Sequence, residues 1–109
     1  MDFRGPILRI FEVRTKPDSA DELLRRFATT SAQVVTGEPG SHGFFFGRDV
    51  ESNGNSVMFV SVWKDLAAVK EKFGEDWQTS YMPAGYAELI EECSVRHVDL
   101  NGEWHVNGL

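Results

Sequence analysis

Cysteine is almost absent from this chain, because Cys93 is the only one among 109 residues. A single cysteine cannot form an intramolecular disulfide and excludes metal sites built from several cysteines. The sequence also lacks a glycine-rich phosphate loop, an HxxxH or CxxC spacing and a nucleophile elbow. Metal and nucleotide chemistry therefore have no support in the sequence, and we expect neither a metal nor another cofactor.

Basic residues and long apolar runs are scarce as well. Lysine and arginine number 11 against 17 acidic residues, which gives a formal net charge of -6. Nucleic acids and anionic membranes both favour clustered Lys and Arg, so neither is an expected partner. No apolar run reaches the length of a membrane span, and the N-terminal segment lacks the apolar core of a signal peptide. The expected location is the cytoplasm.

Strand patterns are present in four places. Apolar residues dominate residues 7–14, a segment that ends at Arg48 after the Pro39-Gly40 turn, residues 56–65 and residues 93–100. The pair Asn53-Gly54 is typical of a hairpin turn, which makes the second and third strands antiparallel neighbours.

Helix patterns separate these strands. An apolar stripe at helical spacing runs from Ala20 to Val35, and Ser19 with Glu22 matches a capping box. Asp65 is expected to cap a second helix over residues 66–73. Pro83 is expected to begin a short helix that reaches Ile90.

The order strand, helix, strand, strand, helix, strand predicts an α+β, ferredoxin-like protomer with an antiparallel sheet. We expect a single domain over residues 1–109, with its core at about residues 6–100 and a polar tail at 101–109. The third strand is apolar on both faces: Val57, Phe59 and Trp63 alternate with Met58, Val60 and Val62. The helices cover only one face, so we expect a second copy of the chain to cover the other in a homodimer.

Three motifs carry a family resemblance. They are the Pro-Gly turn that leads into a Gly-Phe strand at residues 39–44, the FVSVW strand that ends at Trp63, and the Lys64-Asp65 entry to a helix. Over roughly residues 6–100 the chain resembles the antibiotic biosynthesis monooxygenase family of dimeric α/β barrels. The resemblance implies a homodimer and a pocket between sheet and helices. In some members that pocket oxygenates polycyclic phenols without a cofactor, and in others it binds and degrades haem.

The residues disfavour the haem branch of that family. Its members have an Asn on the first strand and, after the third strand, a Trp and an iron-ligating His. This chain has Phe11 at the Asn position, Lys72 at the Trp position, and Tyr81 or Met82 where the His would stand. Because the axial ligand governs haem sites, haem chemistry is disfavoured, and Tyr81, whose tyrosinate could ligate iron, is the one opening left for it.

Cofactor-free oxygenation, the activity of the other branch, requires a base, a dry apolar pocket and hydrogen-bond donors for an oxyanion. Arg9, Tyr81 and His97 are the predicted catalytic residues, while His42 is expected to be exposed in a turn. The predicted walls for a small hydrophobic or aromatic ligand are aromatic residues: Phe11, Phe44, Phe59, Trp63, Trp77 and Tyr86.

Alternatives stay open at this level. Arg9 breaks an apolar strand face, so it must meet either Glu91 or Glu92 in an ion pair, or a ligand. His97 is equally explained as a strand histidine with a hydrogen-bonded neighbour. The chain can therefore be a cofactor-independent monooxygenase, a non-catalytic dimer that binds a small hydrophobic ligand, or an isomerase or decarboxylase that uses His97 or Tyr81.

Overall fold

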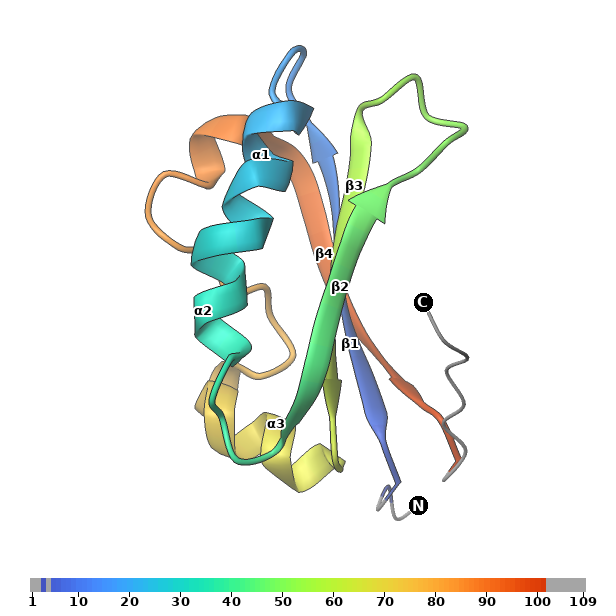
Figure 1. Cartoon of the computed structure of the whole chain (residues 1–109), viewed down its shortest axis with the longest axis vertical. Coiled ribbons are helices and arrows are strands. Elements are labelled where there is room, and N and C mark those ends of the chain that lie inside the picture. The colour runs from blue at the N-terminus through green and yellow to red at the C-terminus, as the bar shows by residue number, and fades with distance from the viewer. Residues whose placement is uncertain (1–2, 4, 102–109) are drawn as a thin grey trace.

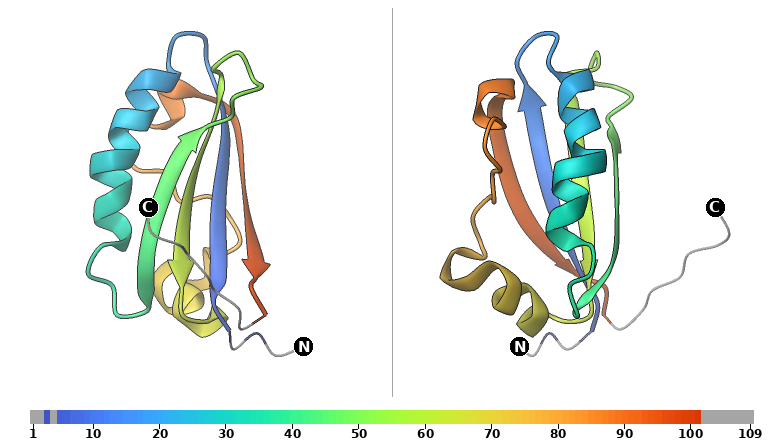
Figure 2. Two further views of the ribbon diagram at one scale, coloured as in Figure 1. Left: turned by 45° about the vertical axis from the view of Figure 1, so that its right-hand side comes forward. Right: turned by 60° about the vertical axis from the view of Figure 1, so that its left-hand side comes forward.

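The chain folds into a four-stranded antiparallel sheet with helices on one face, as seen in a computed structural model that describes residue 3 and residues 5–101 (Figures 1 and 2). The strands are β1 (Ile7–Thr15), β2 (Ser41–Arg48), β3 (Ser56–Trp63) and β4 (Ile90–Asp99). Their spatial order is β2-β3-β1-β4, with the first and third strands in the centre. This is the predicted ferredoxin-like α+β protomer, and that prediction is confirmed.

The hairpin between β2 and β3 follows the predicted turn chemistry. Asn53 and Gly54 both have positive φ angles, of 54° and 84°, which Asn and Gly tolerate best. The two strands pair antiparallel, with Phe46 opposite Phe59 and Phe44 opposite Ser61.

The first helical segment is one rod of three parts (Figure 1): α1 (Ala20–Arg26), a π-helical turn η1 (Phe27–Ser31) and α2 (Ala32–Val35). The predicted apolar stripe is confirmed, since Leu23, Phe27 and Val35 are almost fully buried against the sheet. The predicted capping box is wrong: the Ser19 side chain makes no capping hydrogen bond, because its backbone is already helical at φ -105° and ψ -7°. The π turn was not predicted.

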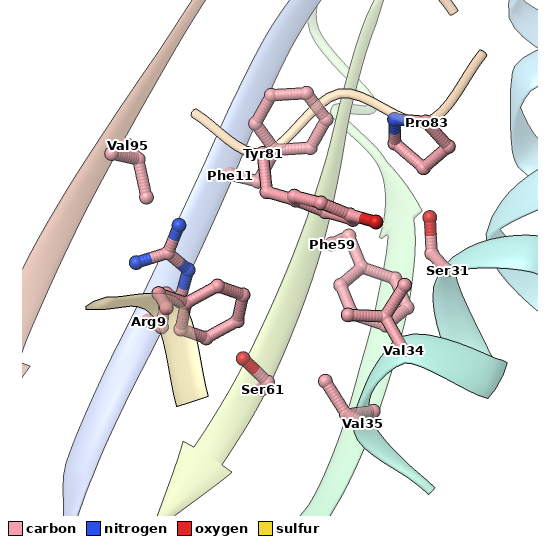
Figure 3. A pocket seen from close by; sticks show the side chains of 11 residues that line it. Arg9, Phe11, Ser31, Val34, Val35, Phe59, Ser61, Tyr81, Pro83 and Val95 are labelled. Atoms are coloured by element: carbon pink, nitrogen blue, oxygen red, sulfur yellow. The ribbon is translucent and has the colours of Figure 1, made fainter. Parts of the chain in front are cut away.

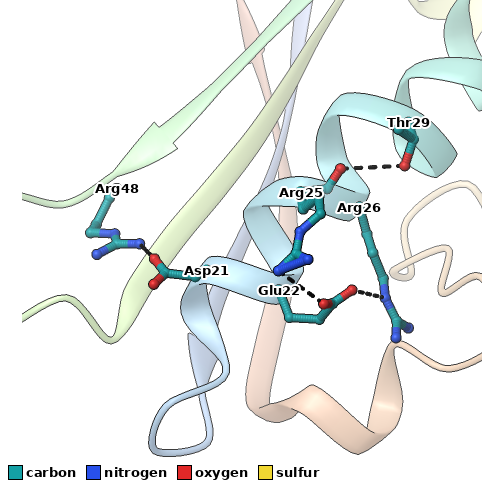
Figure 4. A network of polar contacts seen from close by, with 6 residues as sticks. All are labelled: Asp21, Glu22, Arg25, Arg26, Thr29 and Arg48. Carbon is teal, nitrogen blue, oxygen red and sulfur yellow. Dashed lines mark hydrogen bonds and ion pairs between the residues drawn. The ribbon is translucent and has the colours of Figure 1, made fainter.

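Ion pairs stabilise α1, the N-terminal part of this helical rod (Figure 4). The Glu22 carboxylate forms ion pairs with Arg25 at 3.1 Å and with Arg26 at 2.9 Å. The hydrogen bond from Arg26 lowers the pKa of the Glu22 carboxyl. Asp21 pairs with Arg48 at the end of β2, which ties the helix to the edge of the sheet.

The second helix, α3 (Leu66–Phe73), begins as predicted. Asp65 caps it by accepting a hydrogen bond from the Ala68 backbone N–H at 2.8 Å. Gly40 packs directly on this helix, since a Cβ atom there would lie 2.4 Å from the Cβ of Ala68. Gly40 of the Pro39-Gly40 motif is therefore required by packing between the turn and α3.

The helix predicted to begin at Pro83 is wrong. The segment contains only a short 3₁₀ turn, η3 (Ala87–Leu89), and Pro83 instead opens a turn in which its carbonyl accepts from the Tyr86 N–H at 3.1 Å. Gly85 has a φ of +89°, which a right-handed helix cannot contain. Another 3₁₀ turn, η2 (Gly74–Asp76), follows α3 directly.

The sheet face opposite the helices is left uncovered by any described helix (Figure 2). On this face Val60 and Val62 are buried, while the more peripheral Phe45, Met58 and Val98 are exposed. The two-sided apolar character of β3 is therefore confirmed, and the homodimer that it suggested stays a prediction. The predicted polar tail falls almost entirely on residues 102–109, outside the described residues. None of the described helices is long and apolar enough to cross a membrane.

Candidate functional site

A pocket lies between the helix-facing side of the sheet, the α2 end of the helical rod and the loop that follows α3 (Figure 3). The pocket is half open to solvent: its cavity proper is only about 40 Å³, within about 430 Å³ of unfilled space that includes open solvent. Its lining is mostly aromatic and aliphatic: Arg9, Phe11, Ser31, Val34, Val35, Phe59, Ser61, Phe73, Tyr81, Pro83 and Val95.

Strand register places a polar row across this apolar face. Arg9 on β1 stands opposite Ser61 on β3 and opposite His97 on β4. Directly paired residues of antiparallel strands have Cβ atoms about 5 Å apart, so the three side chains are immediate neighbours. The next row along the same face is apolar and contains Phe59, Phe11 and Val95. The polar row is thus the chemically distinct part of the pocket floor.

Arg9 is the centre of this row and is only 5% exposed. Its guanidinium donates to the backbone carbonyls of Trp77 at 2.5 Å and Thr79 at 3.0 Å, and it lies 3.8 Å above the centre of the Phe73 ring. Burial lowers the pKa of Arg9 to about 10, which still leaves it charged at neutral pH. Among the described residues no carboxylate pairs with it.

The ion pair considered between Arg9 and Glu91 or Glu92 does not form. Register places Glu92 opposite Arg14, and both glutamates pair with that exposed arginine, at 3.3 Å and 3.2 Å. Arg9 points to the other face of the sheet, where its partners are carbonyls and a histidine.

That histidine is His97, whose Nε2 lies 3.0 Å from Nη1 of Arg9. Arginine can only donate, so this Nε2 accepts and the neutral imidazole carries its proton on Nδ1. Burial and, secondly, the charge of Arg9 lower the pKa of His97 to about 4. His97 is therefore neutral at physiological pH, and its basic nitrogen is already occupied by Arg9.

Ser61 provides a second donor beside Arg9. Its Oγ accepts a hydrogen bond from the Nε1–H of Trp63 at 2.9 Å, so its own hydroxyl proton remains available. In Figure 3 this hydroxyl points into the pocket. Sequence reasoning missed Ser61, although the signal was there: it is the polar member of the Phe59-Ser61-Trp63 face.

The mouth of the pocket is formed by the loop after α3. Tyr81 is 54% exposed and its ring lies over the pocket beside Phe73, with a centroid distance of 6.3 Å. Its hydroxyl points inward toward Ser31 and Pro83 (Figure 3). Tyr81 is thus placed to meet a ligand at the mouth of the pocket.

Ser31 and Tyr86 form a buried pair at the helix side of the pocket. Their hydroxyl oxygens are 2.6 Å apart, and the Tyr86 hydroxyl donates to the Arg26 carbonyl at 3.1 Å. Because the single Tyr86 proton is directed to the Arg26 carbonyl, Ser31 donates to Tyr86. Desolvation raises the pKa of Tyr86 despite these hydrogen bonds, so it stays a neutral phenol.

The structure brings only part of the predicted site together. Of the predicted residues, Arg9, Phe11, Phe59 and Tyr81 line the pocket. His97 and Trp77 do not line this pocket. Their rings pack edge to face with their centroids 4.9 Å apart, and both residues line a neighbouring hollow.

The other predicted aromatic residues lie behind the walls. Phe44 stacks on Phe59 with a ring-centroid distance of 5.4 Å, and Trp63 packs against Phe73 with a centroid distance of 5.7 Å. Tyr86 is hydrogen-bonded to Ser31. The sequence did not indicate Phe73 or the small and aliphatic lining residues, because their place depends on how α2, α3 and the loop sit over the sheet. These additional residues are Ser31, Val34, Val35, Pro83 and Val95.

The donor set does not fit a histidine-ligated haem. Within residues 5–101 no cluster of three His, Cys, Asp or Glu side chains could hold a metal ion. Of the described histidines, His97 turns its Nε2 to a guanidinium and His42 is exposed near the start of β2. Neither is available as an axial ligand in the pocket.

Comparisons with known proteins agree with this fold. A family model described as antibiotic biosynthesis monooxygenase matches residues 6–76. No curated protein sequence matches the chain significantly.

Several solved structures are similar in fold. One is a candidate antibiotic biosynthesis monooxygenase from Caulobacter crescentus, with a TM-score of 0.65 and 21% identity over 90% of this chain and 92% of that one. Another is a heme-degrading protein from Mycobacterium tuberculosis, with a TM-score of 0.64 and 22% identity over 99% of this chain and 100% of that one. At these identities the likeness establishes the fold alone.

Proposed function

Because the chain belongs to the antibiotic biosynthesis monooxygenase family, we propose that it is a cofactor-independent monooxygenase that acts on a small aromatic or quinol-type molecule in this pocket. The supporting observation is the buried charge of Arg9 beside a ring-lined cavity. Such a charge stabilises the oxyanion that forms when a phenolic substrate loses its proton, and the electron-rich anion is the form that reacts with oxygen.

The reaction balances without a cofactor. A ring CH₂ next to the ionised system gives two electrons and a proton to one O₂ through a peroxide on that carbon. The same carbon then loses its second proton as the O–O bond breaks, which leaves one oxygen on carbon as a carbonyl and releases the other, with both protons, as water. Arg9 and the Ser61 hydroxyl are proposed to hold the substrate oxyanion, while Phe11, Phe59 and Tyr81 hold the rings.

A homodimer is part of this proposal. The sheet face that no described helix covers carries exposed Phe45, Met58 and Val98 around buried Val60 and Val62. Apolar surface of this kind is stabilised when two sheets stack face to face. The cytoplasmic location remains a prediction from the sequence.

A non-catalytic dimer that binds a small hydrophobic ligand is the second candidate. It is favoured by one observation: none of the described lining residues is a carboxylate or a histidine, so no evident base stands in the pocket. An isomerase or decarboxylase would instead depend on Tyr81, because Nε2 of His97 is engaged by Arg9.

Oxygen consumption distinguishes these candidates. The purified protein, with a chelator and no flavin, is mixed with hydroxyanthrones, which carry the ring CH₂ that this reaction requires, in isotopically labelled oxygen. We expect uptake of O₂ above the uncatalysed rate and one labelled atom in the product. Arg9→Met should lose most of the rate and Arg25→Met, on the exposed face of α1, should keep it. Binding of these compounds without oxygen uptake would leave the ligand-binding candidate instead.

A further inference from the structure

We infer that the pocket selects ligands that arrive as anions, with a carboxylate or an ionised phenolic oxygen attached to an aromatic ring, and that Arg9 binds this charge. The inference rests on the proposed function for its biological use and deepens it by naming the charge of the substrate. The binding preference itself is measured independently of turnover.

The pairing of the arginines carries the argument. Within residues 5–101 every other arginine has a carboxylate partner: Arg14, Arg25, Arg26, Arg48 and Arg96. The side chains of all five are at least 34% exposed, whereas Arg9 is 5% exposed and is the described arginine without such a partner. Burial makes an uncompensated charge costly, so the least solvated cation is the one that most needs a counter-ion.

The contacts of Arg9 leave part of its donor capacity unused. A guanidinium has five N–H donors, and three described acceptors use three of them: the carbonyls of Trp77 and Thr79 and the Nε2 of His97. All three acceptors are neutral. They fix the orientation of the guanidinium without cancelling its charge, so the remaining donors suit an anionic oxygen.

The surroundings favour the same ligand. Ser61 stands directly across from Arg9 and has a hydroxyl proton to donate. No described lining residue is an aspartate or glutamate that would repel an anion. The ring of Phe73 covers one face of the guanidinium, so an oxygen that binds Arg9 must use the N–H donors that the three described acceptors leave free.

The rest of the lining is aromatic and aliphatic, which favours a flat apolar group. Phe11, Phe59, Phe73 and Tyr81 surround the space next to Arg9, with Val34 and Val35 at the helix side. Aromatic walls around one charged anchor describe an aromatic acid or an ionised phenol rather than a flexible polar metabolite.

Paired probes that differ only in charge test this inference. Isothermal titration calorimetry measures the affinities of naphthoate and of naphthamide, which has the same shape and is neutral. Wild-type protein should bind naphthoate at least about tenfold more tightly, a difference of about 1.4 kcal/mol. This comparison within one protein requires no variant to fold.

Two variants then test whether Arg9 is the source of the preference for the anionic probe. Arg9→Met, whose side chain keeps the apolar stem, should bind both probes equally, and Arg25→Met should keep the preference for naphthoate. Equal affinities in the wild type, undetectable naphthoate binding, or a preference that survives in Arg9→Met would each overturn the inference. A charge preference without oxygen uptake would keep the anion site and remove the oxygenase function, whereas uptake without a charge preference would do the reverse.

Discussion

Arg9 retains its charge in a place where solvation is largely lost. Burial lowers its pKa to about 10, and the cost of that burial is offset only by neutral acceptors and by the Phe73 ring. The sequence could single out Arg9 as a break in an apolar face, but it could not name the partners. Glu92 was one of the two glutamates considered as an ion-pair partner of Arg9. It lies opposite Arg14 instead, because strand register decides which side chains meet.

Ser61 is expected to support both the pocket and the core. Ser61→Ala removes the acceptor for the Nε1–H of Trp63, a residue only 1% exposed. A buried donor without an acceptor costs about 1–3 kcal/mol, so the free energy of unfolding in guanidinium chloride should fall by that amount. The control Ser94→Ala, at an exposed position of β4, should change it by less than about 0.5 kcal/mol. Equal changes in both variants would contradict the role given to Ser61.

His97 should make the protein less stable in mild acid. Its pKa is lowered from 6.5 to about 4 in the folded state, so between these pH values the unfolded chain binds more protons than the folded one. The free energy of unfolding contributed by His97 therefore falls as pH drops from 6.5 to 4, and levels off below 4. His97→Gln, which can still accept from Arg9, should show a smaller fall in denaturation curves over this range.

The exposed His42 supplies the control for this measurement. His42→Gln should lose stability with acidification as the wild type does. A fall of equal size in His97→Gln would show that other groups cause it.

The helical elements were predicted well where a single periodicity governs them. The Asp65 cap and the bounds of α3 followed from local chemistry and agree with the structure. The π turn at Phe27–Ser31 and the irregular loop before β4 did not, since both depend on tertiary contacts rather than on local pattern. These are also the elements that supply Ser31, Tyr81 and Pro83 to the pocket.

Tyr86 joins the helical rod to the segment before β4. Tyr86→Phe would leave the Arg26 carbonyl without this donor and the Ser31 hydroxyl without its acceptor. We expect the free energy of unfolding to fall by about 1–3 kcal/mol and amide hydrogen exchange to increase around Ala87–Leu89. The matched change Tyr81→Phe, in a side chain 54% exposed, should affect stability by less than about 0.5 kcal/mol. A similar small effect of both would mean that the buried pair is energetically unimportant.

For the whole molecule, the order of strands and helices was enough to predict the fold, whereas the homodimer inferred from the two-sided β3 strand stays a prediction. The candidate site was predictable in part: Arg9, Phe11, Phe59 and Tyr81 line the pocket, while Trp63 and Tyr86 turned out to lie behind its walls. Side-chain type can identify an aromatic residue as buried, but only the packing of α2 and the loop decides whether it meets a cavity.

The predicted homodimer should depend on the uncovered sheet face. Light scattering after size-exclusion chromatography should give the mass of two chains for the wild type. Phe45→Asp places a charge in the apolar face where Phe45 is 49% exposed, and should give one chain. The control Val50→Asp, in the loop between β2 and β3 at 95% exposure, should stay dimeric. A monomeric wild type at micromolar concentration would refute the proposed face-to-face dimer.

The central claim is that the charge of Arg9 stabilises an oxyanion inside an otherwise apolar pocket. Its most direct measurement is the spectroscopic titration of para-nitrophenol with saturating protein, because the phenol and phenolate forms absorb differently. We expect the pKa of the bound phenol to lie at least about one unit below that of the free phenol, and Arg9→Met to abolish this shift. An unchanged or raised pKa in the wild type, as an apolar cavity without an effective charge would produce, would contradict the claim.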